Sequence, residues 1–416
     1  MLIFSRFVRL VFIGLIVLAG TGQAQRLIRQ FGSSQTDLAN DIALDSEGNV
    51  VIVGFSQSAL PRNEHQGGND AFISKLTPQG DTVFTVQVGT ASGDIASAVA
   101  LDSANNSYVV GGTEGNLAGE NLGINDAFLL SFDSDGNERF RRQFGSNLDD
   151  GAVAVAVDAA DNVYVAGFTR LALPGQTSAG GSDIYVKSFD SQGGERWTVQ
   201  FGSSRDDIAS SLTLLDDGHI FVGGSAEGAM PGNQHSGNRD GFVAKITPAG
   251  GLDFVFQFGT QRNDAITGLA SDGGENIYAL GVTQGLFGMT SAGNDDIFVI
   301  NFNANGVTQV LEQFGTDRFD AAEGFALGND GQLYLTGFTQ GSFTIDGNAG
   351  GNDVFLLVLN DNLQRVRSEQ LGTLENESAR AVAVDASGTV YVVGGTEGVL
   401  SNNVGVGNRD AFLLVY

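Results

Sequence analysis

A signature of Gln, an apolar residue and Gly recurs seven times along this chain of 416 residues. It lies at residues 30–32, 87–89, 143–145, 200–202, 257–259, 313–315 and 370–372, so that successive copies are 56 or 57 residues apart. A period this regular indicates one supersecondary unit repeated in tandem. Because the copies fill the chain from residue 25 to residue 416, we expect a single domain over residues 25–416.

Each unit contains four short runs of β-forming residues separated by turn residues. In the third unit these runs are residues 152–157, 163–168, 183–189 and 196–201. Four short antiparallel strands per unit are typical of a propeller blade. The first run is rich in small residues, such as Ala152, Ala154 and Ala156, which suits the crowded centre of a ring. The chain is therefore predicted to be all-β, a seven-bladed β-propeller with four antiparallel strands per blade.

The two ends of the chain complement each other. The seventh unit stops after its third run, residues 410–416, whereas residues 26–31 match the fourth run of every other unit. Pairing the N-terminal run with the last unit would remove two exposed sheet edges at once. We therefore expect the N-terminal strand to close the last blade.

The first residues have the features of an export signal. Arg6 and Arg9 precede an apolar run at residues 10–20, and the small residues Gly22 and Ala24 offer a cleavage site. The apolar run is well short of the roughly 20 residues that a spanning helix needs. We expect a signal peptide over residues 1–24, no membrane span in the mature chain, and a secreted, periplasmic or cell-surface location. The chain has no Cys, so disulfides cannot stabilise it.

The net charge of −27 limits the partners that this protein can have. Such a surface repels nucleic acid and anionic lipid and attracts cations or basic partners. We expect a monomer that binds a protein or a glycan and does not bind nucleic acid. Calcium is the one candidate cofactor.

Two acidic positions recur in every unit. The first lies seven residues after the signature Gln, at Asp37, Asp94, Asp150, Asp207, Asp264, Asp320 and Glu377. The second opens the third run, at Asp70, Asp126, Asp183, Asp240, Asp296, Asp353 and Asp410. If the strands of a blade run outward in chain order, both sets lie on one rim of the ring. An Asp at such a junction commonly accepts hydrogen bonds from loop amides. The second set also offers candidate calcium ligands, because calcium prefers carboxylate and carbonyl oxygens.

The repeat also resembles a known family. Its pattern is Gln-Phe-Gly-Thr/Ser, then Ala-x-Asp-x-x-Gly-Asn-x-Tyr-x-x-Gly-x-Thr, then Gly-x-Asp-x-Phe. This pattern resembles the bacterial SBBP β-propeller repeat over residues 26–416. The resemblance implies a bacterial propeller that acts outside the cytoplasm, and it brings no catalytic residues with it.

Residues that break the repeat are the better candidates for ligand binding. In the loops before the third run these are Arg62, Glu64, His65, Glu120, Asn121 and His235. His65 and His235 occupy the same position in units one and four, so they are too far apart around a ring to share a metal. The chain lacks a Gly-x-Ser-x-Gly elbow, a phosphate-binding loop and a His-Glu-x-x-His motif, and no catalytic residues are identified.

The sequence favours a binding or scaffold protein that engages a cation, glycan or protein through a loop-bearing, acidic face. The alternative is an extracytoplasmic hydrolase or lyase with a carboxylate site at the channel mouth, since propellers host such sites by loop variation. A cluster of charged residues outside the repeat pattern would favour the enzyme, and a repeat-symmetric rim would favour binding.

Overall fold

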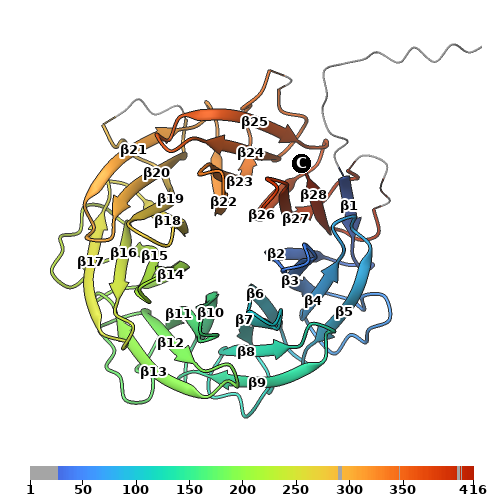
Figure 1. Ribbon diagram of the computed structural model, residues 1–416, viewed down its shortest axis with the longest axis horizontal. Coiled ribbons are helices and arrows are strands. Elements are labelled where there is room, and N and C mark those ends of the chain that lie inside the picture. The colour runs from blue at the N-terminus through green and yellow to red at the C-terminus, as the bar shows by residue number, and fades with distance from the viewer. Residues whose placement is uncertain (1–26, 289–292, 346, 401–402, 404) are drawn as a thin grey trace, which may run out of the picture.

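The computed structural model describes residues 27–288, 293–345, 347–400, 403 and 405–416. These residues form seven four-stranded antiparallel sheets around a central channel, and they contain no helix (Figure 1). The predicted seven-bladed β-propeller is therefore confirmed. The expected signal peptide lies outside the described residues.

The strands follow one another outward from the channel in chain order. Blade 1 contains β2 (Asp37–Leu44), β3 (Val50–Ser56), β4 (Asp70–Leu76) and β5 (Thr82–Val88), and blade 2 contains β6 (Asp94–Leu101), β7 (Ser107–Thr113), β8 (Asp126–Phe132) and β9 (Glu138–Phe144). Blade 3 contains β10 (Asp150–Val157), β11 (Val163–Thr169), β12 (Asp183–Phe189) and β13 (Glu195–Phe201), and blade 4 contains β14 (Asp207–Leu214), β15 (Ile220–Ala226), β16 (Asp240–Ile246) and β17 (Leu252–Phe258).

The remaining blades repeat this order. Blade 5 contains β18 (Asp264–Ser271), β19 (Asn276–Thr283), β20 (Asp296–Asn303) and β21 (Thr308–Phe314), and blade 6 contains β22 (Asp320–Leu327), β23 (Leu333–Thr339), β24 (Asp353–Leu359) and β25 (Arg365–Leu371). Blade 7 contains β26 (Glu377–Val384), β27 (Val390–Thr396) and β28 (Asp410–Val415), and its outer strand is β1 (Leu27–Phe31).

The N-terminal strand closes the ring as predicted. β1 pairs antiparallel with β28, with Leu27 opposite Val415 and Phe31 opposite Ala411. Figure 1 shows β1 beside β28 at the junction between the last blade and the first. This pairing joins the two ends of the described chain, so no propeller blade is left with three strands.

Each innermost strand carries a β-bulge at the same position. In β2 the register shifts between Ala39 and Asp41, and the six other innermost strands shift at the equivalent place. A bulge leaves one residue out of the ladder and turns its side chain. The bulged residues line the channel, and they are Asn40, Ser97, Val153, Ser210, Thr267, Glu323 and Arg380.

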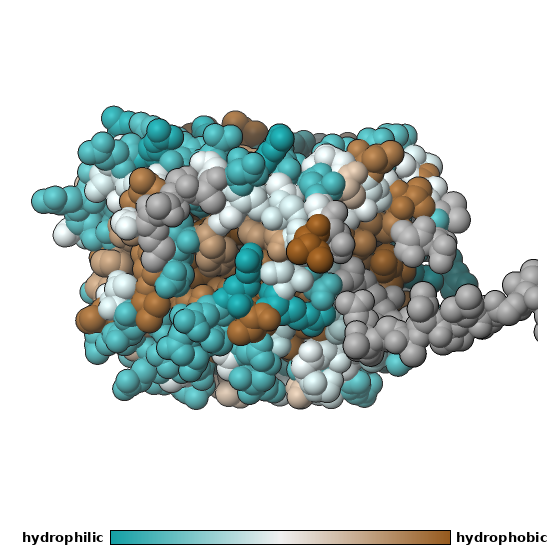
Figure 2. Space-filling view, turned by 90° about the horizontal axis from the view of Figure 1, so that it is seen from above, coloured by the Kyte–Doolittle hydropathy of each residue, from teal (hydrophilic) through white to brown (hydrophobic). Residues whose placement is uncertain are grey.

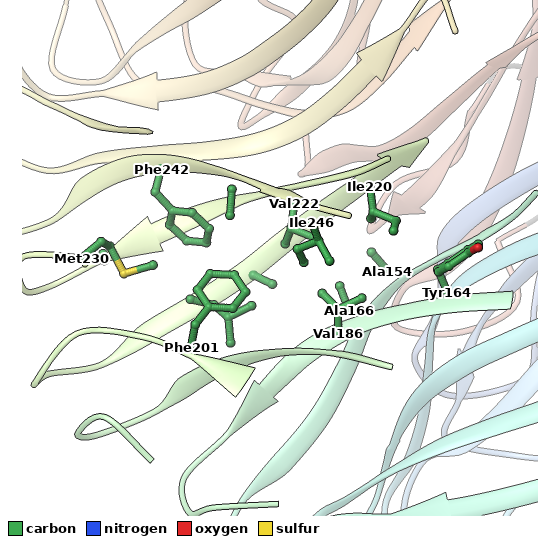
Figure 3. Close-up of a cluster of buried hydrophobic side chains, with 14 residues drawn as sticks. Ala154, Tyr164, Ala166, Val186, Phe201, Ile220, Val222, Met230, Phe242 and Ile246 are labelled. Atoms are coloured by element: carbon green, nitrogen blue, oxygen red, sulfur yellow. The ribbon is translucent and has the colours of Figure 1, made fainter. Parts of the chain in front are cut away.

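The apolar core lies between adjacent blades. Every residue of β4, β8, β12, β16 and β24 is buried, because each of these third strands is covered by a neighbouring blade on both faces. Figure 3 shows the cluster between blades 3 and 4, where Phe201, Met230 and Phe242 pack together. Seen from the side, hydrophilic residues gather along both faces of the disc, and apolar patches lie in the band between them (Figure 2).

The outer strand of each of blades 1 to 4 contacts the next blade through an aromatic ring that packs against a glycine. A Cβ on Gly136 would lie 2.8 Å from Phe84, and one on Gly250 would lie 2.7 Å from Trp197. Both glycines have a positive φ, which suits the turn between the third and fourth strands. At the junction of blades 5 and 6 the pair differs: Leu363 occupies the glycine position at φ 59, and Val310 replaces the aromatic.

Candidate functional site

The loops that precede the first and third strands share one face of the propeller. Gly68 donates its N–H to the carbonyl of Ser92 at 3.0 Å, and Asp94 donates to the carbonyl of Asn69 at 2.7 Å. These bonds connect the loop of one blade to the start of the next. The prediction that both loop sets emerge on the same face is therefore confirmed.

The acidic residues that open the third strands are buried anchors for these loops. Asp70 is fully buried, and its Oδ2 accepts hydrogen bonds from the N–H of Gln66 at 2.8 Å and from Nε2 of Gln87 at 3.0 Å. The Oε1 of Gln87 accepts from the N–H of Leu60 at 2.8 Å. The same Gln-to-Asp bond occurs in the other six blades, at Asp126, Asp183, Asp240, Asp296, Asp353 and Asp410.

The repeated signature is explained by this contact. Its Gln bridges a loop amide and a buried carboxylate, and its Gly allows that carboxylate to approach the backbone. A Cβ on Gly89 would lie 2.3 Å from Oδ1 of Asp70. Any larger residue would displace the anchor, so the Gln-apolar-Gly pattern serves the fold.

The second acidic set lies against the first. A Cβ on Gly202 would lie 2.5 Å from Oδ1 of Asp183 and 2.9 Å from Oδ2 of Asp207, so one glycine separates two buried carboxylates. Burial, and to a smaller degree the neighbouring charges of Asp183 and Asp206, raise the pKa of Asp207 to about 6, against the lowering effect of hydrogen bonds from Ser203. Burial likewise raises the pKa of Asp94, with Asp70 adding to the shift.

Residues of both acidic sets accept hydrogen bonds from loop amides, as an Asp at such a junction commonly does. The two acidic sets lie on the loop-bearing face, but their side chains point inward and are 0 or 1 % exposed. The reason is that loop amides and Gln side chains need acceptors that only buried carboxylates at this junction supply. In the part of the chain that the structure describes, no three His, Asp or Glu side chains gather as metal ligands. A calcium site at these residues stays a prediction.

The candidate ligand residues of blade 1 have separate surroundings. Nδ1 of His65 lies 3.1 Å from Oδ2 of Asp70, so this imidazole belongs to the buried anchor. Glu64 is exposed. Arg62 is exposed at φ 67 and lines a cavity of about 500 Å³ between β1 and blade 1, together with Arg29 and Leu60.

The other candidates lie on blades 2 and 4. Asn121 donates from Nδ2 to the carbonyl of Glu114 at 2.9 Å, which shapes its own loop, and Glu120 is exposed. Nδ1 of His235 lies 3.2 Å from Oδ2 of Asp240, repeating the arrangement of His65. Among the described residues the structure does not bring the candidates of the three blades into one site.

The channel holds a set of charged residues that sequence reasoning missed. Its cavity of about 280 Å³ is lined by the bulged residues of all seven blades. Within it, Nη1 of Arg380 donates to a carboxylate oxygen of Glu323, which joins blades 6 and 7. Burial raises the pKa of Glu323, although the charges of Arg380 and Arg409 oppose this shift.

Asp41 also lines the channel, next to the bulge of blade 1. Its Oδ2 accepts the N–H of Val99 in blade 2 at 2.8 Å. Burial raises the pKa of Asp41 to about 6, more than its backbone hydrogen bonds lower it. A carboxyl with a strongly shifted pKa in a cavity is a candidate functional group.

A fourth charged residue, Arg409, precedes β28 and lies near Glu323 and Arg380, although it does not line the cavity. Its guanidinium lies over Gly395, where a Cβ would be 2.6 Å from Nε of Arg409, and Nη2 donates to Oγ of Ser378. The signal for Asp41 was present in the sequence. The equivalents of Asp41 in the other units are small residues such as Ala98, Ala154 and Gly324, so a charged residue there breaks the pattern.

Comparisons with known proteins agree on the fold. No family model matches the chain. It is 24% identical over 332 residues to the regulatory protein FlaEY of Caulobacter vibrioides, an alignment that spans 70% of this chain and 35% of the relative. The match therefore covers about a third of that relative's length.

Solved structures with the same architecture are distant in sequence. One is a catalytically inactive virginiamycin B lyase from Staphylococcus aureus with quinupristin, at 11% identity and a TM-score of 0.52 over 94% of this chain and 100% of that one. Another is the Pan2 WD40 domain of Neurospora crassa, at 11% identity and 0.53 over 92% and 97%. The β-propeller domain of the Trilobed protease from Pyrococcus furiosus also matches, at 11% identity and 0.51 over 92% and 94%. At such identity these likenesses show the fold alone.

Proposed function

We propose that this protein is an exported binding or scaffold protein that engages a glycan or protein through its loop-bearing face. The observation that carries the proposal is a ring of polar residues, one after the second strand of each blade, whose identities vary around the propeller. We call it the rim ring, and it consists of Gln57, Glu114, Arg170, Glu227, Gln284, Gln340 and Glu397.

The rim ring is held in place by the backbone. The N–H of Gln57 donates to the carbonyl of Thr36 at 3.0 Å, and the N–H of Glu397 donates to that of Asn376 at 2.9 Å, as at the equivalent positions of the other blades. Several side chains are fixed as well. Oε1 of Gln284 accepts from Asn263 at 2.9 Å, and Oε2 of Glu397 accepts from Asn376 at 2.8 Å. Polar groups fixed before binding lose little entropy when a partner is bound.

The contrast between buried and exposed positions supports recognition. The anchors beneath the loops are nearly the same in every blade, because the fold requires them. The rim ring instead combines amides, carboxylates and one guanidinium on a shared scaffold. Blade-to-blade variation on a rigid scaffold is how repeat proteins present a specific surface.

Export is part of this proposal. It is supported by the signal expected in residues 1–24 and by the resemblance to the SBBP repeat. The described residues contain no helix that is long and apolar enough to cross a membrane. The name of FlaEY describes that relative as a regulatory protein, and regulation agrees better with binding than with catalysis.

A second candidate function is that of a hydrolase or lyase acting at the channel. The observation that favours it is Asp41, a carboxyl that lines the channel and whose pKa is raised to about 6. A group that titrates near neutral pH suits general acid–base catalysis. Its carboxylate is engaged with the backbone of Val99, however, so a structural role competes with the catalytic one.

The binding function is tested with the exported protein on an array of neutral and acidic oligosaccharides, and by cross-linking to a defined set of envelope proteins. We expect saturable binding that falls at least about tenfold when Glu114 and Gln284 are both replaced by Ala. The matched control replaces Asp135 and Asn305, at exposed turns between third and fourth strands, by Ala. Absence of binding to every probe, or equal loss in both variants, would overturn the proposal.

A further inference from the structure

A cavity of about 500 Å³ lies where the ring closes, between β1 of blade 7 and the strands β4 and β5 of blade 1, whose places Figure 1 shows. We call it the seam cavity. Its walls are mostly apolar, with Phe31 on the side of β1 and Phe72 and Leu76 on the side of blade 1. Sites for small molecules typically have about 300–1,000 Å³ and apolar walls with a few polar groups. The seam cavity therefore has the size and the lining of a ligand site.

A small residue of β4 leaves this space open. Ser74 lines the seam cavity, and the equivalent residues of blades 2, 5, 6 and 7 are Leu130, Ile300, Leu357 and Leu414. Those larger side chains are buried in the apolar clusters between blades. Oγ of Ser74 lies 2.8 Å from Oγ1 of Thr85, which also lines the cavity. At this junction two hydroxyls thus replace the apolar volume that fills four others.

Arg62 lines the seam cavity from the loop before β4, and its backbone is in an unfavourable conformation. It lies in a turn in which the N–H of Asn63 donates to the carbonyl of Leu60 at 2.9 Å, and its φ is 67. The equivalent turns of blades 3 and 4 have Gly175 at φ 77 and Gly232 at φ 78, because glycine adopts such a φ without steric cost. Arginine there costs conformational free energy. A strained residue beside a ligand-sized cavity points to a function of its side chain.

The side chains that line the seam cavity carry two positive charges and no negative one. Arg29 and Arg62 both line it, and both are exposed to solvent. No Asp or Glu is among the described residues of the lining. Within the part of the chain that the structure describes, neither guanidinium is paired with a carboxylate. In a protein of net charge −27, such a local excess of positive charge favours an anion.

The acidic residues of this region do not cancel that excess. Asp37 and Asp410 lie beyond Gly32, where a Cβ would be 2.5 Å from Oδ2 of Asp37 and 3.1 Å from Oδ1 of Asp410. Both carboxylates are buried and accept hydrogen bonds from the protein. Glu64 and Asp81 are exposed and do not line the cavity, so water and salt screen their charges.

We propose that the seam cavity binds a small monocarboxylate with an apolar body. The apolar walls hold the body of the ligand, and the guanidiniums of Arg29 and Arg62 donate to its carboxylate, for which arginine is well suited. None of the rim-ring residues lines the seam cavity, so this site goes beyond the proposed function. Because one wall belongs to β1 and the other to blade 1, the ligand also stabilises the closed ring.

Isothermal titration calorimetry of the intact protein tests the site with two acids, octanoate and 3-phenylpropanoate. Saturable binding of either supports the proposal, and the tighter of the two shows whether a chain or a ring fits the walls. Acetate supplies the charge without the body, and 1-octanol supplies the body without the charge. We expect both to bind at least about tenfold more weakly than octanoate. Octyltrimethylammonium reports non-specific attraction to the acidic surface, and it should also bind more weakly.

Two variants connect the binding to the seam cavity. Arg62→Gly introduces the residue of blades 3 and 4, so it should weaken octanoate binding about tenfold or more without lowering the melting temperature. Ser74→Leu introduces the residue of three other blades, and its side chain should block the cavity and weaken binding as much. The matched control is Arg365→Gln, at an exposed position of β25, which should leave the affinity unchanged.

Melting curves give a second measurement, since a ligand bound only by the closed, native ring raises the melting temperature saturably. The increase with octanoate should be lost in both variants and kept in Arg365→Gln. Four results would overturn the site: no saturable binding of either acid, equal affinity for octanoate and 1-octanol, equal affinity of Arg62→Gly and Arg365→Gln, or full affinity in Ser74→Leu. All of these variants keep the rim ring, so their failure would leave the proposed function standing.

Discussion

Nε2 of Gln30 donates a hydrogen bond of 2.7 Å to Oδ2 of Asp410, a residue 380 positions away. In blade 1 the equivalent bond joins Gln87 and Asp70, which are 17 positions apart. The same local contact is thus reused to close the ring. Forming the bond between Gln30 and Asp410 costs more chain entropy than forming the bond between Gln87 and Asp70, because it closes a loop of nearly the whole chain.

Deleting residues 25–32 is expected to lower the melting temperature by several degrees or to cause aggregation. The deletion removes β1 and exposes the edge of β28, and exposed edges pair with other chains. Differential scanning calorimetry and light scattering check this result. Deleting only residues 25 and 26 is the control. A melting curve that the longer deletion leaves unchanged would refute closure by this strand.

Gln257→Leu is expected to destabilise the protein by about 1–3 kcal/mol, because it removes one hydrogen bond to the buried Asp240 carboxylate and leaves the N–H of Met230 without an acceptor. Urea unfolding measures the change. Gln309→Leu, at an exposed position of β21, is the control. A loss of less than about 0.5 kcal/mol would show that the signature Gln does not anchor the loop.

Stability should rise as the pH falls from 7 to 5. The pKa of Asp41 is raised from 3.8 to about 6, so between these values the folded state binds more protons than the unfolded state. The contribution is complete below about pH 4 and is lost as the pH rises through about 6. It amounts to at most about 3 kcal/mol, at roughly 1.4 kcal/mol per pKa unit.

Urea unfolding at several pH values checks this dependence. Asp41→Asn should raise the stability at pH 7 and flatten the slope between pH 5 and 7, whereas Asp135→Asn, at an exposed turn, should leave the slope unchanged. Stability that falls between pH 7 and 5 in the parent protein would contradict the prediction.

Calcium and sodium chloride at equal ionic strength are expected to raise the melting temperature equally. The carboxylates that open the third strands already accept protein hydrogen bonds, so added salt should act by screening the net charge of −27. A saturable shift specific to calcium would instead support the cation sites, since a ligand bound only by the native state stabilises it. Asp70→Asn and Asp126→Asn would then abolish that increment.

Leu363→Gly is expected to destabilise the protein by about 2–5 kcal/mol, because it opens a cavity beside Val310 in the buried cluster between blades 5 and 6. The double variant Leu363→Gly with Val310→Phe recreates the ring-on-glycine contact of Trp197 and Gly250, and it should recover part of the loss. Urea unfolding gives the coupling free energy. A double variant no more stable than Leu363→Gly would show that the two positions are independent.

The candidate site was predicted only in outline. Arg62, Glu64, His65, Glu120, Asn121 and His235 were singled out because they break the repeat, and the structure distributes them over three blades. His65 and His235 were expected to be free for a ligand, but each of them contacts a buried Asp. Glu323 and Arg380 were missed because they are 57 positions apart and meet only where two bulges face one channel.

The sequence by itself determined the number of blades, the strands of each blade and the closing role of residues 27–31. All of these follow from a period along the chain, which is a local property that a one-dimensional pattern records completely. Only the tertiary structure decided which way the recurrent carboxylates point and which charges meet in the channel. Those outcomes depend on contacts between adjacent blades, because Asp183 and Asp207, or Arg380 and Glu323, acquire their surroundings only when the ring is complete.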